Sequence, residues 1–86
     1  MASYELVFKK SVAKDLRALP SADVKRILLR IRALASDPRP SGCEKLSGQE
    51  RYRVRQGAYR IVYEIEDSRL VVLVVKIGHR RDVYRS

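Results

Sequence analysis

Residues 51–63 read RYRVRQGAYRIVY, and this alternating stretch decides the fold. Basic and apolar side chains alternate on both sides of Gly57-Ala58, a pattern typical of two strands joined in a β-hairpin. A two-residue turn with glycine first places Gln56 opposite Tyr59. Because directly opposed residues share a face of the sheet, one face collects the apolar side chains of Tyr52, Val54, Ile61 and Tyr63. The other face collects the arginines Arg51, Arg53, Arg55 and Arg60.

This register predicts an anion-binding site. A three-residue loop would mix arginines with the apolar side chains, so the apolar pattern favours the two-residue turn. That turn sets Arg55 opposite Arg60, and like charges opposed across two strands destabilise a sheet unless an anion lies between them. A single arginine is better explained as part of a solvated sheet face. Taken together with Arg80, which follows the last strand, Arg53, Arg55 and Arg60 predict a phosphate site.

The first half of the chain predicts one strand and two helices. Residues 4–8 alternate in the manner of a short strand, and from Lys9 the apolar residues recur at helical spacing until Pro20 ends the first helix. Ser21 is placed to cap a second helix, which the Asp37-Pro38-Arg39-Pro40 segment closes. The two helices are expected to form a hairpin with one shared apolar surface.

The second half adds a loop and three strands, of which the hairpin supplies two. Residues 41–50 predict a loop with two glycines. After the hairpin, Asp67-Ser68 predicts a second two-residue turn, with Glu66 opposite Arg69. Residues 70–77 are apolar on both faces, which is typical of a central strand. This pairing predicts that the last strand ends beside the first hairpin turn.

Composition limits the architecture and the partners. The 86 residues suffice for one domain, expected over residues 1–86. The predicted class is α+β in the order β-α-α-β-β-β, a helical hairpin packed on a small, mostly antiparallel sheet. Lys and Arg number 19 against 10 Asp and Glu, and the net charge of +9 favours a polyanionic partner: nucleic acid, an anionic membrane surface or an acidic protein.

No apolar run reaches the roughly 18 residues of a membrane span. No signal peptide is visible at residues 1–8, and the single cysteine fits a reducing cytoplasm.

Four side chains outside the arginine cluster are weaker candidates for chemistry. His79 is the only histidine, a residue type that often serves as acid or base, but a packing role in a loop beside the turn is favoured. Cys43 is expected to be an incidental loop thiol. Glu64 and Glu66 lie two residues apart on the arginine face, where ion pairs with the arginines opposite are favoured over a metal site.

The ordered set of motifs resembles the RelE branch of the RelE/ParE toxin superfamily over nearly the whole chain. Besides the alternating start and the two helices, the matching segments are Asp37-Pro38-Arg39-Pro40, Lys45-Leu46-Ser47-Gly48, Tyr52-Arg53-Val54-Arg55, Gly57-Ala58-Tyr59-Arg60-Ile61-Val62-Tyr63 and Gly78-His79-Arg80-Arg81-Asp82-Val83-Tyr84. Each segment alone has low specificity, and their order within one short chain is the strong signal. The resemblance implies the RelE-like microbial ribonuclease fold. It also implies an mRNA endonuclease that cuts in the ribosomal A site, inhibits translation and is silenced by an antitoxin.

The resemblance also implies which residues act. The catalytic positions of the family fall on Arg53, Arg55, Arg60, Arg80 and Tyr84. RNA contacts are expected from Lys45, Arg51 and Arg81. One well-known family pattern has lysines where this chain has Arg53 and Arg55, and arginine effectively cannot lose a proton. The identity of the general base therefore stays open, as does the choice between proton transfer and base stacking for Tyr84.

The implied reaction suits an arginine cluster. The 2′-OH of RNA attacks the adjacent phosphate, and the products carry a 2′,3′-cyclic phosphate and a 5′-hydroxyl. Arginine forks stabilise the charge that develops on the phosphate oxygens. Because the sequence offers no convincing cluster of carboxylates for magnesium, no metal and no cofactor is expected. The expected partners are the ribosome and mRNA, a small acidic RelB-like antitoxin, and operator DNA only through that antitoxin, with no membrane contact.

Two other functions fit the sequence. A ParE-like toxin inhibits DNA gyrase by binding it and cleaves no RNA; the joint presence of Arg60, Arg80 and Tyr84 favours RelE over this alternative. A non-enzymatic basic module that binds nucleic acid fits the net charge equally well. Cutting of translated mRNA separates the RelE function from both alternatives.

Overall fold

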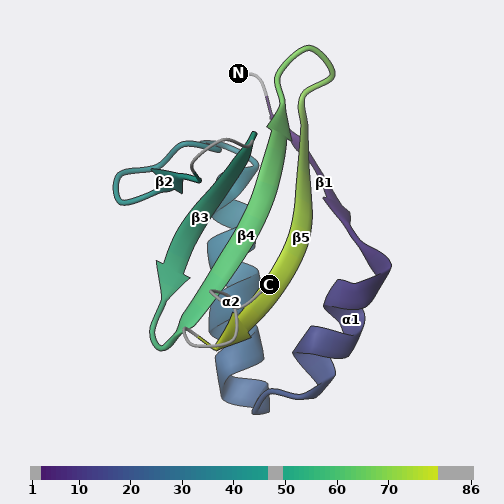
Figure 1. The fold of residues 1–86 in the computed structure, drawn as a ribbon, viewed down its shortest axis with the longest axis vertical. Helices are drawn as coiled ribbons and strands as arrows, with labels where there is room; N and C mark the ends of the chain where they lie inside the picture. Colours follow the sequence, from purple (N-terminus) through teal and green to yellow (C-terminus); the bar gives the residue numbers. More distant parts are fainter. Residues whose placement is uncertain (1–2, 47–49, 80–86) are drawn as a thin grey trace.

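The computed structural model describes residues 3–46 and 50–79, which form one five-stranded sheet with two helices packed against one face (Figure 1). The strands lie in the order β1-β5-β4-β3-β2; β1 is parallel to β5, and the other neighbours are antiparallel. The elements are β1 (Glu5–Phe8), α1 (Lys10–Arg17), α2 (Ser21–Leu34), β2 (Glu44–Lys45), β3 (Arg51–Gln56), β4 (Tyr59–Glu66) and β5 (Val71–His79). The α+β class and the mostly antiparallel sheet are confirmed. No helix in the described part of the chain is long and apolar enough to cross a membrane.

The sheet has one strand more than the sequence predicted. Within the segment expected to be a loop, Glu44 and Lys45 pair with Arg53 and Tyr52 as β2, so the order is β-α-α-β-β-β-β. Arg53 Nη2 lies 2.6 Å from Glu44 Oε2 and ties the two strands together. A strand of two residues shows no periodicity, which is why the sequence pattern missed it.

The helix cap predicted at Ser21 is wrong. Pro20 occupies the N-cap position with extended backbone angles, no side chain caps the helix, and Ser21 is already helical. The carbonyl oxygen of Pro20 accepts hydrogen bonds from the N–H groups of Asp23 and Val24, both at 3.0 Å. Proline suits this position because its lost N–H and fixed φ cost nothing there, and Asp23 complements the positive end of the helix dipole.

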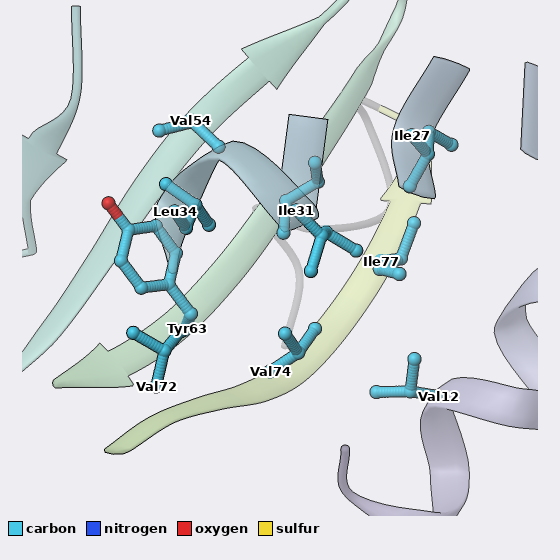
Figure 2. Packing of buried hydrophobic residues seen from close by; sticks show 10 residues of the cluster. Val12, Ile27, Ile31, Leu34, Val54, Tyr63, Val72, Val74 and Ile77 are labelled. Carbon is cyan, nitrogen blue, oxygen red and sulfur yellow. The ribbon is translucent and has the colours of Figure 1, made fainter. Parts of the chain in front are cut away.

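The core lies between α2 and the inner face of the sheet, which is the face that the helices cover (Figure 2). Its fully buried members are Val12, Ile27, Ile31, Leu34, Val54, Ile61, Tyr63, Val72, Val74 and Ile77. Tyr63 donates a 2.7 Å hydrogen bond from its hydroxyl to the carbonyl oxygen of Pro38, and burial raises the pKa of this tyrosine. Tyr52 stacks on Tyr63 with ring centroids 5.9 Å apart. The prediction that the hairpin's apolar face is the core face is confirmed.

The connection between β4 and β5 differs from the predicted two-residue turn. Glu66 pairs with Val71 instead of Arg69, so residues 67–70 all belong to the turn. Leu70 adopts a positive φ of 53°, a conformation that leucine seldom takes. The sequence pattern gave no sign of a leucine in that conformation.

A β-bulge in β5 changes the register a second time. Tyr63 lies opposite Val74, whereas Val62 lies opposite Lys76, so Val75 is the extra residue. Beyond the bulge, Gly78 lies opposite Arg60. The expectation that the last strand ends beside the Gly57 turn is therefore confirmed, although the predicted pairing along it is wrong.

Candidate functional site

The register of the β3–β4 hairpin is confirmed. Gln56 pairs with Tyr59 and Arg55 with Arg60 across a two-residue turn. Gly57 has a φ of +61°, which glycine adopts without the steric cost that other residues meet. The arginines of the hairpin therefore share the outer face of the sheet, which is the face away from the helices.

A hollow of about 270 Å³ lies beside these arginines. Within the described residues, β2 accompanies β3 only as far as Arg53, and the hollow lies where β3 continues beyond that point. In the part of the chain that the structure describes, four arginines from three elements reach it. Among the described residues, the lining consists of Arg30, Gly42, Glu44, Arg53, Arg55 and Arg60.

The arginine pair at this hollow is asymmetric. Arg55 is exposed, whereas Arg60 is only 4% exposed. Among the described residues, no carboxylate lies within ion-pair distance of Arg60, and no side chain or backbone oxygen accepts a hydrogen bond from it. A buried cation without an anionic partner is unfavourable. The predicted opposition of two arginines is confirmed, but the expectation that Arg60 lies on an exposed face is wrong.

Other predicted site residues have acidic partners. Arg53 pairs with Glu44 at the edge of the hollow. Arg51 Nε lies 2.9 Å from Glu64 Oε2. Lys45 Nζ lies 3.7 Å from a carboxylate oxygen of Glu50. Lys45 and Arg51 are thus neutralised outside the lining of the hollow. The other three predicted residues lie outside the described part of the chain; they are Arg80, Arg81 and Tyr84.

His79 lies in β5 and not in a loop, contrary to expectation. Its ring meets the ring of Tyr59 edge-on, with centroids 6.0 Å apart. The hydroxyl of Tyr59 donates a 3.0 Å hydrogen bond to Asp23 Oδ2, and this bond raises the pKa of Tyr59. The histidine therefore packs at the end of the hairpin, beside the Gly57 turn.

The remaining weaker candidates have structural roles. The pairing expected for the two glutamates is confirmed, because Arg51 pairs with Glu64 and Arg69 with Glu66. The described residues contain no group of three or more His, Cys, Asp or Glu side chains arranged to hold a metal ion. Cys43 is half-buried and packs against the core, so it is more than an incidental loop thiol.

Two basic residues near the site were missed by sequence reasoning. Arg30 comes from α2 and reaches the hollow; only the packing of the helix against the sheet reveals this. Lys76 lies opposite Val62 on the outer face. It was detectable in principle, because it is the single charged residue in the otherwise apolar stretch 70–77.

Comparison with known proteins shows consistent similarity along the chain. The family model "ParE toxin of type II toxin-antitoxin system, parDE" matches residues 6–84. Toxin RelG of Mycobacterium tuberculosis is 28% identical over 86 residues, covering 95% of this chain and 97% of that protein. A chain of the archaeal RelE–RelB complex from Pyrococcus horikoshii OT3 has 31% identity and a TM-score of 0.81, with 91% of this chain and 96% of that chain covered. A chain of the intact Escherichia coli RelBE toxin–antitoxin complex has 28% identity and a TM-score of 0.78, with 90% and 96% covered.

Proposed function

The chain belongs to the ParE toxin family of type II toxin–antitoxin systems and is a RelE-type member of the RelE/ParE superfamily, and we propose that it cleaves mRNA in the ribosomal A site and so inhibits translation. Membership in the family makes it a toxin. The cleavage activity is supported by the likeness to RelE chains and by the arginine-lined hollow at the end of the β3–β4 hairpin.

Arg60 carries the proposal. Arg60 is only 4% exposed, lines the hollow, lies opposite Arg55 in the hairpin and has no carboxylate partner among the described residues. A bound phosphate supplies the missing negative charge, and guanidinium groups bind phosphate oxygens with two parallel hydrogen bonds. A phosphate of the RNA backbone is thus the ligand that balances this pair.

The chemistry that follows is cleavage by the RNA itself. The 2′-oxygen forms a bond to the adjacent phosphorus, and the bond from phosphorus to the 5′-oxygen breaks. The proton of the 2′-OH leaves to a base, and the departing 5′-oxygen takes up a proton. Arg55 and Arg60 stabilise the charge on the phosphate oxygens as the pentacoordinate state forms. Arg80 and Tyr84 join this set by their match to the family's catalytic positions.

Arg53 differs from Arg60 in having a carboxylate partner before substrate binds. Its ion pair with Glu44 neutralises it before substrate arrives. A substrate phosphate competes with Glu44 for the same guanidinium, so Arg53 engages RNA by exchanging partners. Arg53 therefore contributes less to the initial binding of phosphate than Arg60, which has no described carboxylate to give up.

Dependence on the ribosome follows from the side chains of the hairpin. Arginine effectively cannot act as a base, so Arg53, Arg55 and Arg60 stabilise charge without removing the proton of the 2′-OH. Correct alignment of the 2′-OH with the phosphate must then supply much of the rate, and orientation can contribute about 7–11 kcal/mol. In this proposal, the ribosomal A site holds the message in the conformation that provides that alignment.

A small acidic antitoxin is the proposed regulator. The solved relatives include toxin–antitoxin complexes of RelE with RelB, and this chain carries a net charge of +9. An acidic segment that orders on binding can cover such a surface. In this proposal the toxin acts in the cytoplasm, and it reaches operator DNA only as part of the complex with the antitoxin.

The decisive experiment maps cuts in a translated message. Purified protein is added to ribosomes programmed with a defined codon in the A site, and primer extension locates the cuts. We expect cuts in register with the reading frame, a 5′-hydroxyl and a 2′,3′-cyclic phosphate at the new ends, and no cutting of the same RNA without ribosomes. Fast cutting of naked RNA regardless of codon would contradict the dependence on the ribosome.

The same preparation distinguishes the alternatives. The family model that matches this chain is named for ParE toxins, so gyrase poisoning is the second candidate. Absence of cuts together with gyrase-dependent DNA cleavage would establish it. Absence of both activities, with retained binding to nucleic acid, would identify a binding module.

A further inference from the structure

The bulge in β5 determines where Lys76 points. Val72 and Val74 face the core, so strict alternation would send position 76 to the core and position 77 outward. The extra residue at the bulge reverses this: Ile77 is buried in the core, and Lys76 lies opposite Val62. Val62 packs with Val75 in a separate cluster, so Lys76 shares the outer face of the sheet.

Lys76 thereby joins the row of residues that contains Arg53. Arg53, Val62 and Lys76 lie side by side on β3, β4 and β5. The Cα atoms of Arg53 and Lys76 are about 10 Å apart, given two strand spacings. Arg60 lies two residues before Val62 on the same face, so the valine is flanked by basic side chains on all three strands.

The charge of Lys76 is not neutralised within the described part of the chain, where no carboxylate lies within ion-pair distance of it. The nearest acidic positions on its own face are engaged elsewhere, Glu64 with Arg51 and Glu44 with Arg53. A bulge disrupts the hydrogen-bond ladder locally, and bulges recur next to active sites because they redirect a side chain.

We propose that the β5 bulge delivers Lys76 to the RNA, where its ammonium group binds a backbone phosphate next to the one held by Arg55 and Arg60. This proposal rests on the proposed RNA-cleaving function. The flexible stem of lysine lets the ammonium group reach over Val62, and it binds phosphate as a point charge without a fixed fork. Lys76 thus acts as a substrate-binding residue and not as a structural one.

The test compares Lys76→Met with Lys76→Arg. Binding of a short single-stranded RNA, made uncleavable by 2′-deoxy substitution, is measured across a salt series. We expect Lys76→Met to weaken binding about 10- to 100-fold, the range for a lost hydrogen bond to a charged group. The slope of log affinity against log salt should fall by roughly 0.7, as for one lost phosphate contact on a single strand. Lys76→Arg keeps the charge and should stay near wild type.

Lys25→Met is the matched control, because Lys25 is an exposed lysine on α2, in the layer covering the opposite face. It should leave both the RNA affinity and the salt slope unchanged, and thermal melts should show that all variants fold.

On programmed ribosomes, Lys76→Met should raise KM far more than it lowers kcat. Unchanged RNA binding in Lys76→Met would overturn the proposal, as would an effect confined to antitoxin binding or an equal loss in Lys76→Arg. If the wild-type protein binds RNA through Lys76 but never cleaves it, the proposed cleavage function is refuted and the binding role of Lys76 is not.

Discussion

Arg60 is the only charged side chain that is buried in the described part of the chain. Its position follows from the hairpin register, which sets it opposite Arg55 at one end of β4. The protein therefore carries a largely buried arginine directly opposite a second arginine. Such an arrangement is unfavourable for folding and favourable for binding an anion, so we expect one substitution to change stability and activity in opposite directions.

Replacing Arg60 by methionine should reveal this opposition. The cleavage rate on programmed ribosomes should fall by about 10²–10³, the usual effect of removing one donor to a developing oxyanion. The free energy of unfolding should be unchanged or higher by up to about 1–2 kcal/mol, because methionine keeps most of the volume and removes an unpaired buried charge. Arg60→Lys should restore activity only in part, since it lacks the bidentate fork. Single-turnover cleavage and urea unfolding measure the two quantities.

The control for this prediction is Arg69→Met. Arg69 is exposed in the turn after β4, and its Nη1 lies 3.7 Å from Glu66 Oε1. Exposed ion pairs of this kind contribute little, so both cleavage and stability should remain close to wild type. Equal cleavage by Arg60→Met and Arg69→Met would show that the arginine pair takes no part in cleavage.

At the scale of elements, one hairpin could be predicted from the sequence and the next could not. The β3–β4 register depends on local information: a glycine at the turn and strict alternation on both sides. The β4–β5 register depends on Leu70 at a positive φ and on the bulge at Val75, which are set by packing against the whole core. The burial of Arg60 and the position of Arg30 at the hollow likewise depend on tertiary packing, which the local sequence pattern does not show.

The turn at Gly57 makes a testable contribution to the site. Its φ of +61° disfavours any residue with a Cβ, although no atom lies within 4 Å of the place where that Cβ would be. The cost of Gly57→Ala is therefore conformational, about 1 kcal/mol of unfolding free energy. Gly57→Asn should cost less, because asparagine tolerates the left-handed region. Urea unfolding would contradict this account if alanine proved as stable as glycine.

At the scale of the whole molecule, one polar cluster joins distant parts of the chain. Asp67, in the turn between β4 and β5, accepts a 2.7 Å hydrogen bond from the Tyr4 hydroxyl and two hydrogen bonds from the Arg39 guanidinium, at 3.2 and 2.9 Å. Arg39 also lies over the Tyr52 ring, 5.2 Å from its centroid. The cluster therefore links the N-terminus, the segment after α2 and the far turn of the sheet.

Because of this cluster, we expect the thermal stability of the protein to depend on pH in the acidic range. The hydrogen bonds from Arg39 and then from Tyr4 lower the pKa of Asp67. A lowered pKa in the folded state means that the contribution is present above the unfolded value, about 4, and is lost as pH falls further. Asp67→Asn should therefore lower Tm at pH 7, and its difference from wild type should shrink below about pH 4. Thermal melts across this range measure the effect.

The Arg39→Met variant tests whether Asp67 stabilises the protein through its contact with Arg39. If the contribution comes from the Arg39–Asp67 contact, adding Asp67→Asn to Arg39→Met should lower Tm by less than Asp67→Asn does alone. Fully additive changes in Tm at pH 7 would show that the Asp67 carboxylate does not act through Arg39. A Tm difference between Asp67→Asn and wild type that persists unchanged at pH 3 would show that the charge of the carboxylate is not the cause.

The pairing of β1 with β5 has a consequence for how the protein is made. Of the described strands, β1 is synthesised first, yet its neighbour in the sheet is the last of them, β5 (Figure 1). Until β5 has been synthesised, β1 has no neighbour in the sheet, β4 lacks its second neighbour, and Val72, Val74 and Ile77 are missing from the core. Contacts between distant parts of a chain form late for this reason. The nascent chain thus cannot complete its sheet and core until the ribosome has moved past β5.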